Sequence, residues 1–135
     1  MKQEIHPLIE AGRILVVPGV YDVLSARIAY QSGFHTAVLT GYGVAAAHLG
    51  RPDVGLFTQT EIIDVARRIK SNVDIGLVVD GDTGFGGPLN VERMVRELVQ
   101  IGVRGLILED QCWPKRCGHM DGKEVIDPEE HADKI

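Results

Sequence analysis

The chain has 135 residues, of which 44% are hydrophobic and 24% are charged, and this is the composition of an ordinary globular domain. A net charge of −5 without basic runs argues against general binding to nucleic acid or to an anionic membrane surface. The longest apolar runs fall far short of the roughly 20 residues that a membrane span needs.

Two further features concern the cellular compartment. Residues 1–7 contain no apolar segment of the kind found in signal peptides. Two cysteines in a chain of this size do not make a disulfide framework. We therefore expect a cytoplasmic protein.

Short apolar runs alternate with amphipathic stretches along the chain. Four runs bounded by Gly, Pro or Asp predict buried strands, at residues 14–17, 36–39, 75–79 and 105–108. The first helix is predicted over residues 23–31. Its inward face would carry Leu24, Ile28 and Ala29.

Three more helices are predicted further along the chain. Residues 60–69 place apolar side chains at helical spacing: Ile62, Val65, Ala66 and Ile69. Asn90 is predicted to cap a helix that runs to Gln100 and ends before Gly102. Its inward side chains would be Val91, Met94, Val95, Leu98 and Val99. Asp127 and Pro128 predict the start of a last helix.

Apolar strands that alternate with helices predict an α/β fold with a parallel sheet. Four βα units are about half of a (β/α)₈ barrel, which typically needs about 250 residues. The chain is therefore either a small open sheet or the N-terminal half of a barrel, with residues 1–135 as a partial and truncated domain. A half barrel leaves open sheet edges, so we expect it to need a partner.

Polar residues follow three successive strands. Thr40-Gly41-Tyr42-Gly43 follows the second strand, Asp80-Gly81-Asp82 the third, and Glu109 the fourth. In parallel α/β folds the carboxyl ends of the strands carry the chemistry, although Asp and Gly are also common in turns. Because acids recur after consecutive strands, this edge is the predicted active site.

The pair Asp80 and Asp82 has the chemistry of a site for a hard cation. Two carboxylates two residues apart can turn toward one ion, and oxygen ligands suit Mg²⁺ or Mn²⁺ rather than zinc. Glu109 and Asp53 could complete this site, directly or through water.

The segment Lys115-Arg116-Cys117-Gly118-His119 sets a thiol among three groups that are, or can become, cations. Such neighbours stabilise a thiolate and can also hold an anionic substrate. The alternative is a solvated basic loop with an incidental cysteine.

Two other motifs give weaker signals. Residues 41–46 match a G-x-G-x-x-A dinucleotide fingerprint with Glu61 twenty residues after Gly41, but the following helix can run only to about Leu49. Cys112, Cys117 and His119 lack a fourth ligand with zinc-site spacing.

Taken together, the motifs resemble the isocitrate lyase/phosphoenolpyruvate mutase superfamily. Residues 115–119 match its K-[KR]-C-G-H motif, and further motifs stand in the family's order over nearly the whole chain. These are Thr40-Gly41-Tyr42-Gly43, Gly50-Arg51-Pro52-Asp53-Val54-Gly55, Val79-Asp80-Gly81-Asp82-Thr83-Gly84-Phe85-Gly86 and Leu108-Glu109-Asp110-Gln111. Within this superfamily, the motifs resemble those of the short bacterial enzymes methylisocitrate lyase and 2,3-dimethylmalate lyase.

The resemblance implies a (β/α)₈ barrel that binds Mg²⁺ at Asp80 and Asp82, helped through water by Asp53 and Glu109. It also implies retro-aldol cleavage of a 2-hydroxy di- or tricarboxylate into a 2-oxo acid and a carboxylate, in a homotetramer. The implied substrate-binding residues are Thr40, Gly41, Tyr42, Arg116 and Gly118; the implied catalytic residues are Cys117, Lys115, His119 and Glu109.

In that scheme Cys117 protonates the carbanion. The role implied for its neighbours is to lower the pKa of the Cys117 thiol or to neutralise the anion; these neighbours are Lys115, Arg116 and His119. The presence of Cys117-Gly118-His119 favours a lyase over the mutases and hydrolases of the superfamily, which commonly lack these residues.

Two departures qualify the resemblance. Val38 stands where the methylisocitrate lyases carry a tyrosine, and Tyr42 is a candidate substitute. The family's later strands supply an Arg, a Glu and an Asn to the substrate carboxylates, and these strands lie beyond Ile135. A truncated, non-catalytic product therefore stays an alternative.

Overall fold

The structure is a computed structural model that describes residues 14–135, so the expectation for residues 1–7 lies outside the described residues. Its elements follow one another as β1 (Gly19–Val20), α2 (Val23–Gln31), β2 (Thr36–Leu39), α3 (Gly41–Val44), the π-helical turn η1 (Ala45–Leu49), α4 (Gln59–Asn72), β3 (Gly76–Asp80), α5 (Pro88–Ile101), β4 (Gly105–Ile107) and α6 (Pro128–Lys134).

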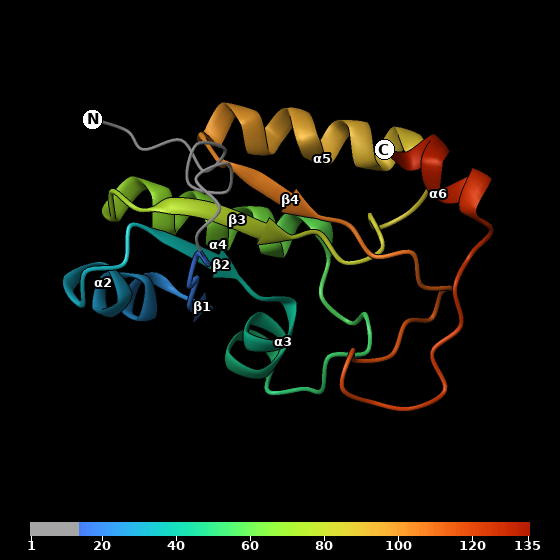
Figure 1. Cartoon of the computed structure of the whole chain (residues 1–135), viewed down its shortest axis with the longest axis horizontal. Helices are drawn as coiled ribbons and strands as arrows, with labels where there is room; N and C mark the ends of the chain where they lie inside the picture. The colour runs from blue at the N-terminus through green and yellow to red at the C-terminus, as the bar shows by residue number, and fades with distance from the viewer. Residues whose placement is uncertain (1–13) are drawn as a thin grey trace.

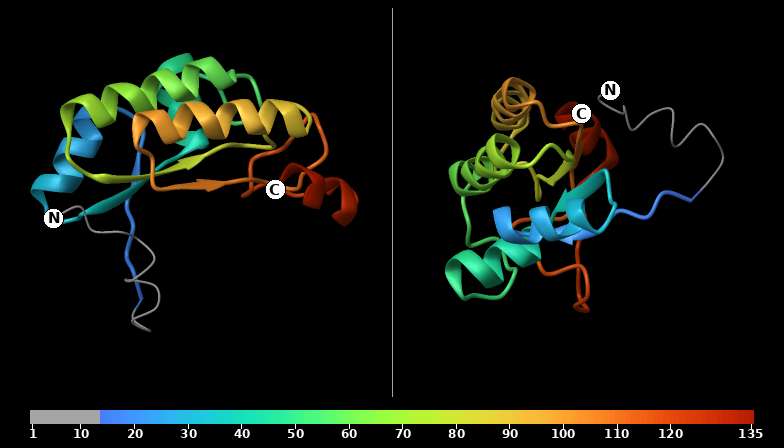
Figure 2. Two further views of the ribbon diagram at one scale, coloured as in Figure 1. Left: turned by 90° about the horizontal axis from the view of Figure 1, so that it is seen from above. Right: turned by 90° about the vertical axis from the view of Figure 1, so that its left-hand side faces the viewer.

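The four strands form one parallel sheet in the order β1-β2-β3-β4 (Figure 1). Each strand pairs with the next strand of the chain, and α2, α4 and α5 lie in the connections. Seen end-on in the right-hand view of Figure 2, these helices follow an arc along one face of the curved sheet. Consecutive βα units are arranged in this way in a (β/α)₈ barrel, of which four units are present. The predicted parallel α/β fold is confirmed.

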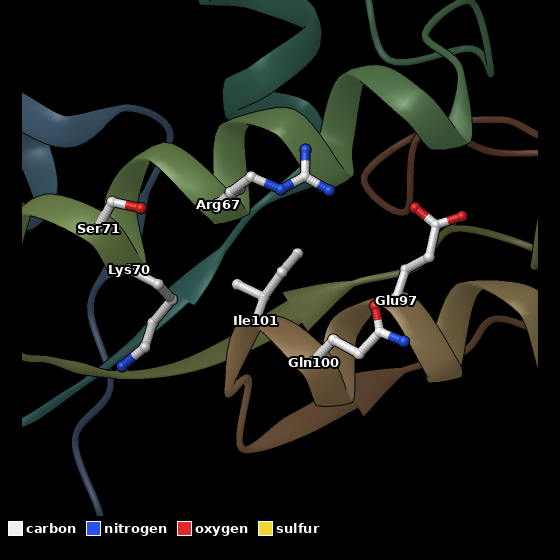
Figure 3. Close-up of a pocket in the computed structure, with 6 residues that line it drawn as sticks. All are labelled: Arg67, Lys70, Ser71, Glu97, Gln100 and Ile101. Atoms are coloured by element: carbon white, nitrogen blue, oxygen red, sulfur yellow. The ribbon is translucent and has the colours of Figure 1, made fainter.

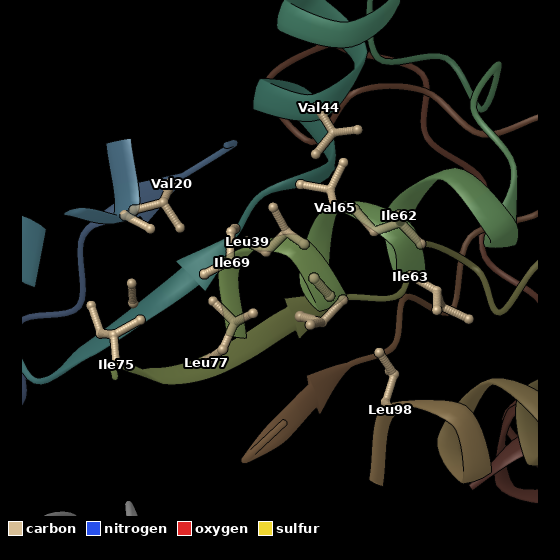
Figure 4. Packing of buried hydrophobic residues seen from close by; sticks show 14 of the residues in the cluster. Val20, Leu39, Val44, Ile62, Ile63, Val65, Ile69, Ile75, Leu77 and Leu98 are labelled. Atoms are coloured by element: carbon tan, nitrogen blue, oxygen red, sulfur yellow. The ribbon is translucent and has the colours of Figure 1, made fainter. Parts of the chain in front are cut away.

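The apolar core lies between the sheet and its helices (Figure 4). On β2 and β3, Leu39, Leu77 and Val79 are fully buried, whereas Val78 on the other face of β3 is half-buried. From α4, Ile62 and Ile69 close over these strands. The alternation along β3 means that helices cover one face of the sheet, as in a barrel wall.

Helix α4 fulfils the prediction for its inward face. Its buried side chains include the four that the sequence indicated: Ile62, Val65, Ala66 and Ile69. A capping box fixes its start, because the Thr58 side chain accepts from the Glu61 N–H while the Glu61 carboxylate accepts from the Thr58 N–H.

Helix α5 begins earlier than predicted. Gly87 is the N-cap and Pro88 opens the helix, so Asn90 lies inside the first turn, where its side-chain oxygen accepts from the Gly87 N–H at 3.2 Å. Its inward face is narrower than predicted: Val91, Met94 and Leu98 are buried. Val95 and Val99 are exposed. The helix ends as predicted at Gly102, whose φ of +84° suits glycine.

The predicted first strand is wrong. Residues 14–17 have no strand partner, Ile14 is 94% exposed and Val16 is 66% exposed, and the strand is instead Gly19–Val20. The hydrogen bonding from β2 extends back along the first strand as far as Pro18, whose carbonyl accepts from the Val38 N–H at 2.9 Å. An apolar run does not form a ladder where no neighbouring strand runs alongside it.

The predicted inward face of α2 is wrong in part. The helix has the predicted bounds, but Leu24 and Ile28 are exposed and the small side chains Ala26 and Ala29 are buried. Small residues let α2 lie close to β1, β2 and α4, and the larger side chains then point outward. The last helix, α6, is confirmed with Asp127 as its cap. None of the helices within residues 14–135 has the length and apolar content that crossing a membrane requires.

Candidate active site

The carboxyl ends of β2 and β3 are joined through Asp80. This residue ends β3, and one oxygen of its carboxylate accepts from the Gly41 N–H at 3.0 Å. The other oxygen accepts from the Asp82 N–H at 3.0 Å. Asp80 therefore fixes the turn after β2 against the turn after β3, as the predicted common edge requires.

The turn after β3 places Asp82 in an uncommon backbone conformation. Its φ is +55°, in the left-handed region that aspartate enters more readily than most non-glycine residues. Its side chain is fully buried, and one carboxylate oxygen accepts from the Thr83 N–H at 3.0 Å. The Glu109 N–H donates to the Asp82 carbonyl at 2.8 Å, which ties this turn to the segment after β4.

Lys115 is the central cation of the site. Its ammonium lies 2.8 Å from Asp53 and 3.2 Å from Asp82, and all three side chains are buried. The pairs bring together the loop before α4, the turn after β3 and the loop after β4. Trp113 adds a second contact between these loops, because its ring lies against Gly55, whose φ is +74°.

Burial and the neighbouring charges shift the pKa values of several groups in this cluster. Burial alone would lower the pKa of Lys115, but its pairs with Asp53, Asp82 and Glu109 outweigh burial and raise that pKa to about 12. Burial raises the pKa of Asp82 to about 6, against the opposing effect of Lys115. Burial also raises the pKa of Glu109, and the charge of Asp80 adds to that rise.

A loop from Cys112 to Glu124 carries the thiol of Cys117. Its two ends are held together because the Cys112 N–H donates to the Glu124 carbonyl and the Ile126 N–H donates to the Asp110 carbonyl, both at 2.8 Å. At its tip the Lys123 ammonium donates to two backbone carbonyls, those of Gly118 and Met120. The loop is thus a pinched excursion with internal hydrogen bonds.

Within this loop the predicted site residues lie in different surroundings. Lys115 turns into the carboxylates, and the Arg116 guanidinium donates to the Asp121 carbonyl at 3.3 Å. Cys117 is half-buried, while Gly118 and His119 are exposed. The roles of these residues toward the Cys117 thiol stay predictions.

The predicted substrate-binding turn after β2 already uses part of its hydrogen-bonding capacity. The Thr40 hydroxyl accepts from the Gly43 N–H at 2.8 Å and caps α3, and the Gly41 N–H is engaged by Asp80. Tyr42 is 60% exposed above this turn. Val38, where the resemblance implies a tyrosine, is a half-buried residue of β2.

The carboxylate oxygens at this edge are ligands of the kind that suit a divalent cation, although in this structure Lys115 is paired with two of these carboxylates. Within residues 14–135 no three His, Cys, Asp or Glu side chains are grouped so that they could hold a metal ion. Four carboxylates at this edge nevertheless lie close enough for charges among them to raise the pKa values of Asp82 and Glu109; the four are Asp53, Asp80, Asp82 and Glu109. Lys115 neutralises one charge, and one buried oxygen of Asp82 has no hydrogen-bond partner. Carboxylate oxygens are among the ligands that Mg²⁺ prefers.

Gln111 is a residue of this site to which the sequence motifs assign no role. Its side chain is buried between Glu109 and the backbone of Arg116. The available signal was its position two residues after a carboxylate that follows a strand.

A separate hollow lies away from this edge, between α4 and α5 (Figure 3). It is lined by Arg67, Lys70, Ser71, Glu97, Gln100 and Ile101. Lys70 there donates to the Ile75 carbonyl at 2.7 Å, so its ammonium helps to close the turn from α4 to β3.

The fold and the acidic edge define the class of the molecule as an enzyme-type (β/α)₈ half barrel. Residues 5–135 match the family model described as phosphoenolpyruvate phosphomutase. The chain belongs to this family, which confirms the resemblance seen in its motifs.

Three relatives illustrate the similarity. The petal death protein of Dianthus caryophyllus is 53% identical over 135 residues, covering 99% of this chain and 42% of that protein. The probable 2-methylisocitrate lyase 1 of Corynebacterium glutamicum is 46% identical, covering 93% of this chain and 41% of that protein. The 2,3-dimethylmalate lyase of Eubacterium barkeri is 42% identical, covering 98% and 46%. The chain therefore spans less than half the length of these relatives.

Solved structures give the same result for the fold. An oxaloacetate acetylhydrolase in complex with 3,3-difluorooxalacetate has a TM-score of 0.86 at 41% identity, covering 90% of this chain and 42% of that one. A 2,3-dimethylmalate lyase has a TM-score of 0.88 at 37% identity, covering 96% and 43%. A phosphonopyruvate hydrolase in complex with oxalate and Mg²⁺ has a TM-score of 0.86 at 28% identity, covering 98% and 45%. The chain matches the N-terminal half of this barrel fold.

Proposed function

We propose that this chain forms the N-terminal half of a Mg²⁺-dependent carbon–carbon lyase. The substrate class would be a 2-hydroxy di- or tricarboxylate of the 2,3-dimethylmalate or 2-methylisocitrate type. The observation that carries the proposal is the anchoring of the Cys117 loop, through Lys115, on the carboxylates Asp53 and Asp82. In this proposal the anchoring would bring the proton donor Cys117 and the proposed cation site to the same edge of the sheet.

In the proposed reaction a base of the site takes the proton of the 2-hydroxyl, the C2–C3 bond breaks and C2 becomes the carbonyl of a 2-oxo acid. The electron pair of the broken bond stays on C3, next to a carboxylate, and Cys117 donates the proton that C3 then takes up. The turn Thr40–Tyr42 would bind substrate oxygens, and the loop would exclude water as it closes. Arg116, Gly118 and His119 lie on that loop and would face the anion.

Asp80 and Asp82 would hold Mg²⁺ or Mn²⁺, with Asp53 and Glu109 acting through water. The bound ion would supply Lewis-acid stabilisation of negative charge on substrate oxygens. Titration of the protein with Mn²⁺, followed by electron paramagnetic resonance, tests this part of the proposal. We expect binding that Asp80→Asn weakens about tenfold or more, whereas Asp74→Asn, at an exposed acid, leaves it unchanged. Equal binding by both variants would contradict the site.

A chimeric barrel tests the reaction. The chain replaces the matching segment of the Eubacterium barkeri 2,3-dimethylmalate lyase, to which it is 42% identical, and pyruvate release from 2,3-dimethylmalate is measured. We expect Mg²⁺-dependent cleavage that Cys117→Ser reduces about 100-fold or more, while Cys112→Ser, at the other free thiol, retains most of it. A Cys117→Ser chimera with most of the rate would remove Cys117 from the acid role. The 135-residue chain alone is expected to be inactive.

A hydrolase that acts on oxaloacetate is the second candidate. The similarity to oxaloacetate acetylhydrolase, at 41% identity over 90% of this chain, favours it. A corresponding chimera, whose second half comes from that acetylhydrolase, would then release acetate and oxalate from oxaloacetate. Cleavage of oxaloacetate without cleavage of the 2-hydroxy diacid would decide for this candidate.

We also propose a cytoplasmic homo-oligomer, a tetramer in the complete protein. Two free cysteines within the described residues agree with a reducing compartment. Light scattering on the complete barrel measures the mass directly, and a monomer would contradict this proposal.

A further inference from the structure

The buried amide of Gln111 connects the strand end to the inside of the Cys117 loop. Its Nε2 donates to the Glu109 carboxylate at 2.8 Å, and its Oε1 accepts from the Arg116 N–H at 3.1 Å. The side chain is 7% exposed. One amide therefore joins a predicted catalytic carboxylate to the backbone between Lys115 and Cys117.

The ends of this loop are held without the Gln111 side chain. Backbone hydrogen bonds link Cys112 to Glu124 and Ile126 to Asp110, and the backbone of Gln111 forms a bridge with Val125. The Gln111 side chain acts further inside the loop, at Arg116. Its loss should therefore loosen the interior of the loop while the base stays closed.

The two hydrogen bonds require an amide. The Glu109 carboxylate needs a donor and the Arg116 N–H needs an acceptor, and Asn and Gln are the uncharged side chains that offer both from one planar group. A donor aimed at an ionised carboxylate also makes a stronger hydrogen bond than a neutral pair does.

We propose that Gln111 is a positioning residue, whose amide sets the distance between Glu109 and the Arg116 backbone and so places the Lys115–Cys117 segment over the acidic edge. The inference rests on the proposed function for the meaning of this segment. The tests below use protein without metal or substrate, so they can fail while the proposed lyase activity holds, and the reverse.

The first test compares Gln111→Met with the unchanged chain. Methionine keeps the length of the side chain and removes both hydrogen bonds. Two rates are followed by mass spectrometry: tryptic cleavage of the Arg116–Cys117 bond and alkylation of Cys117 by iodoacetamide. We expect both to rise about fivefold or more, the factor that corresponds to one net hydrogen bond. Gln100→Met, at an exposed glutamine of α5, is the matched control and should leave both rates unchanged.

The second test reverses the polarity of the pair. Gln111→Glu keeps the acceptor for Arg116 but sets two carboxylates against each other, so both rates should again rise; it also serves if Gln111→Met does not fold. The double variant Glu109→Gln/Gln111→Glu restores a donor opposite an acceptor, so its rates should return to within about twofold of the unchanged chain. Rates that stay unchanged in the single variant, or that stay high in the double variant, would overturn the positioning role.

Discussion

The apolar core under the sheet and the charged cluster at its carboxyl edge are both buried, but they are assembled differently. In the core, Leu77 of β3 meets side chains of α4 that repeat at helical spacing. At the edge, Lys115 meets Asp53 and Asp82, which lie on separate loops. Many individually weak packing contacts hold the core, whereas a few specific charges hold the edge. The edge should therefore be more sensitive to the loss of a single group.

The largest effect is expected from Lys115→Met. Removal of the ammonium leaves the buried carboxylates of Asp53 and Asp82 without their cation, at a cost of about 3–5 kcal/mol. Urea denaturation measures the fall in the free energy of unfolding. Lys134→Met, in the last turn of α6, is the control and should cost less than about 0.5 kcal/mol. A loss below about 1 kcal/mol for Lys115→Met would show that the edge does not depend on this cation.

A smaller effect is expected from Leu77→Ala in the core. The side chain is fully buried, and its loss should cost about 3 kcal/mol through lost burial and the cavity that remains. Leu24→Ala on α2 is the matched control, because Leu24 is 65% exposed and its loss should cost less than about 1 kcal/mol. Equal losses for the two variants, in the same denaturation experiment, would mean that another surface covers the outer face of α2.

The sequence predicts only part of the packing of the apolar core. Helical spacing predicts four of the five buried side chains of α4, all but Ile63, because this helix packs on the sheet along one continuous stripe. It failed for α2, where Leu24 and Ile28 are apolar but point outward. Periodicity indicates that an apolar face exists, but the face that is buried depends on neighbours that come from elsewhere in the chain.

The candidate site likewise has a part that the sequence predicts and a part that it does not. The order of strands and turns was enough to place Asp80, Asp82 and Glu109 at one edge, because parallel strands all end on the same side. The direction of the Lys115 side chain was not predictable from its neighbours along the chain. It depends on Asp53, 62 positions earlier, and on the contact between Trp113 and Gly55. Contacts between distant loops leave no period in the sequence.

The smallest effect is expected at the start of α4, where the interaction is local. The Glu61 carboxylate accepts from the Thr58 N–H at 2.7 Å and from its hydroxyl at 2.8 Å, and the backbone hydrogen bond is the main cause that lowers the pKa of Glu61. The folded state therefore holds the ionised form more strongly than the unfolded chain does. This stabilisation is fully present above the ordinary glutamate pKa and is lost as the pH falls through the lowered one.

Glu61→Gln should reduce the free energy of unfolding by about 0.5–1 kcal/mol at pH 7, and the difference from the unchanged chain should shrink as the pH falls toward 3. Denaturation at a series of pH values measures this, with Glu124→Gln, at an exposed acid, as the control. A difference that persists undiminished at pH 3 would mean that the charge of Glu61 contributes nothing. Because this capping box joins residues three positions apart, its loss should weaken the start of α4 and leave the charged edge, with its Lys115 pairs, in place.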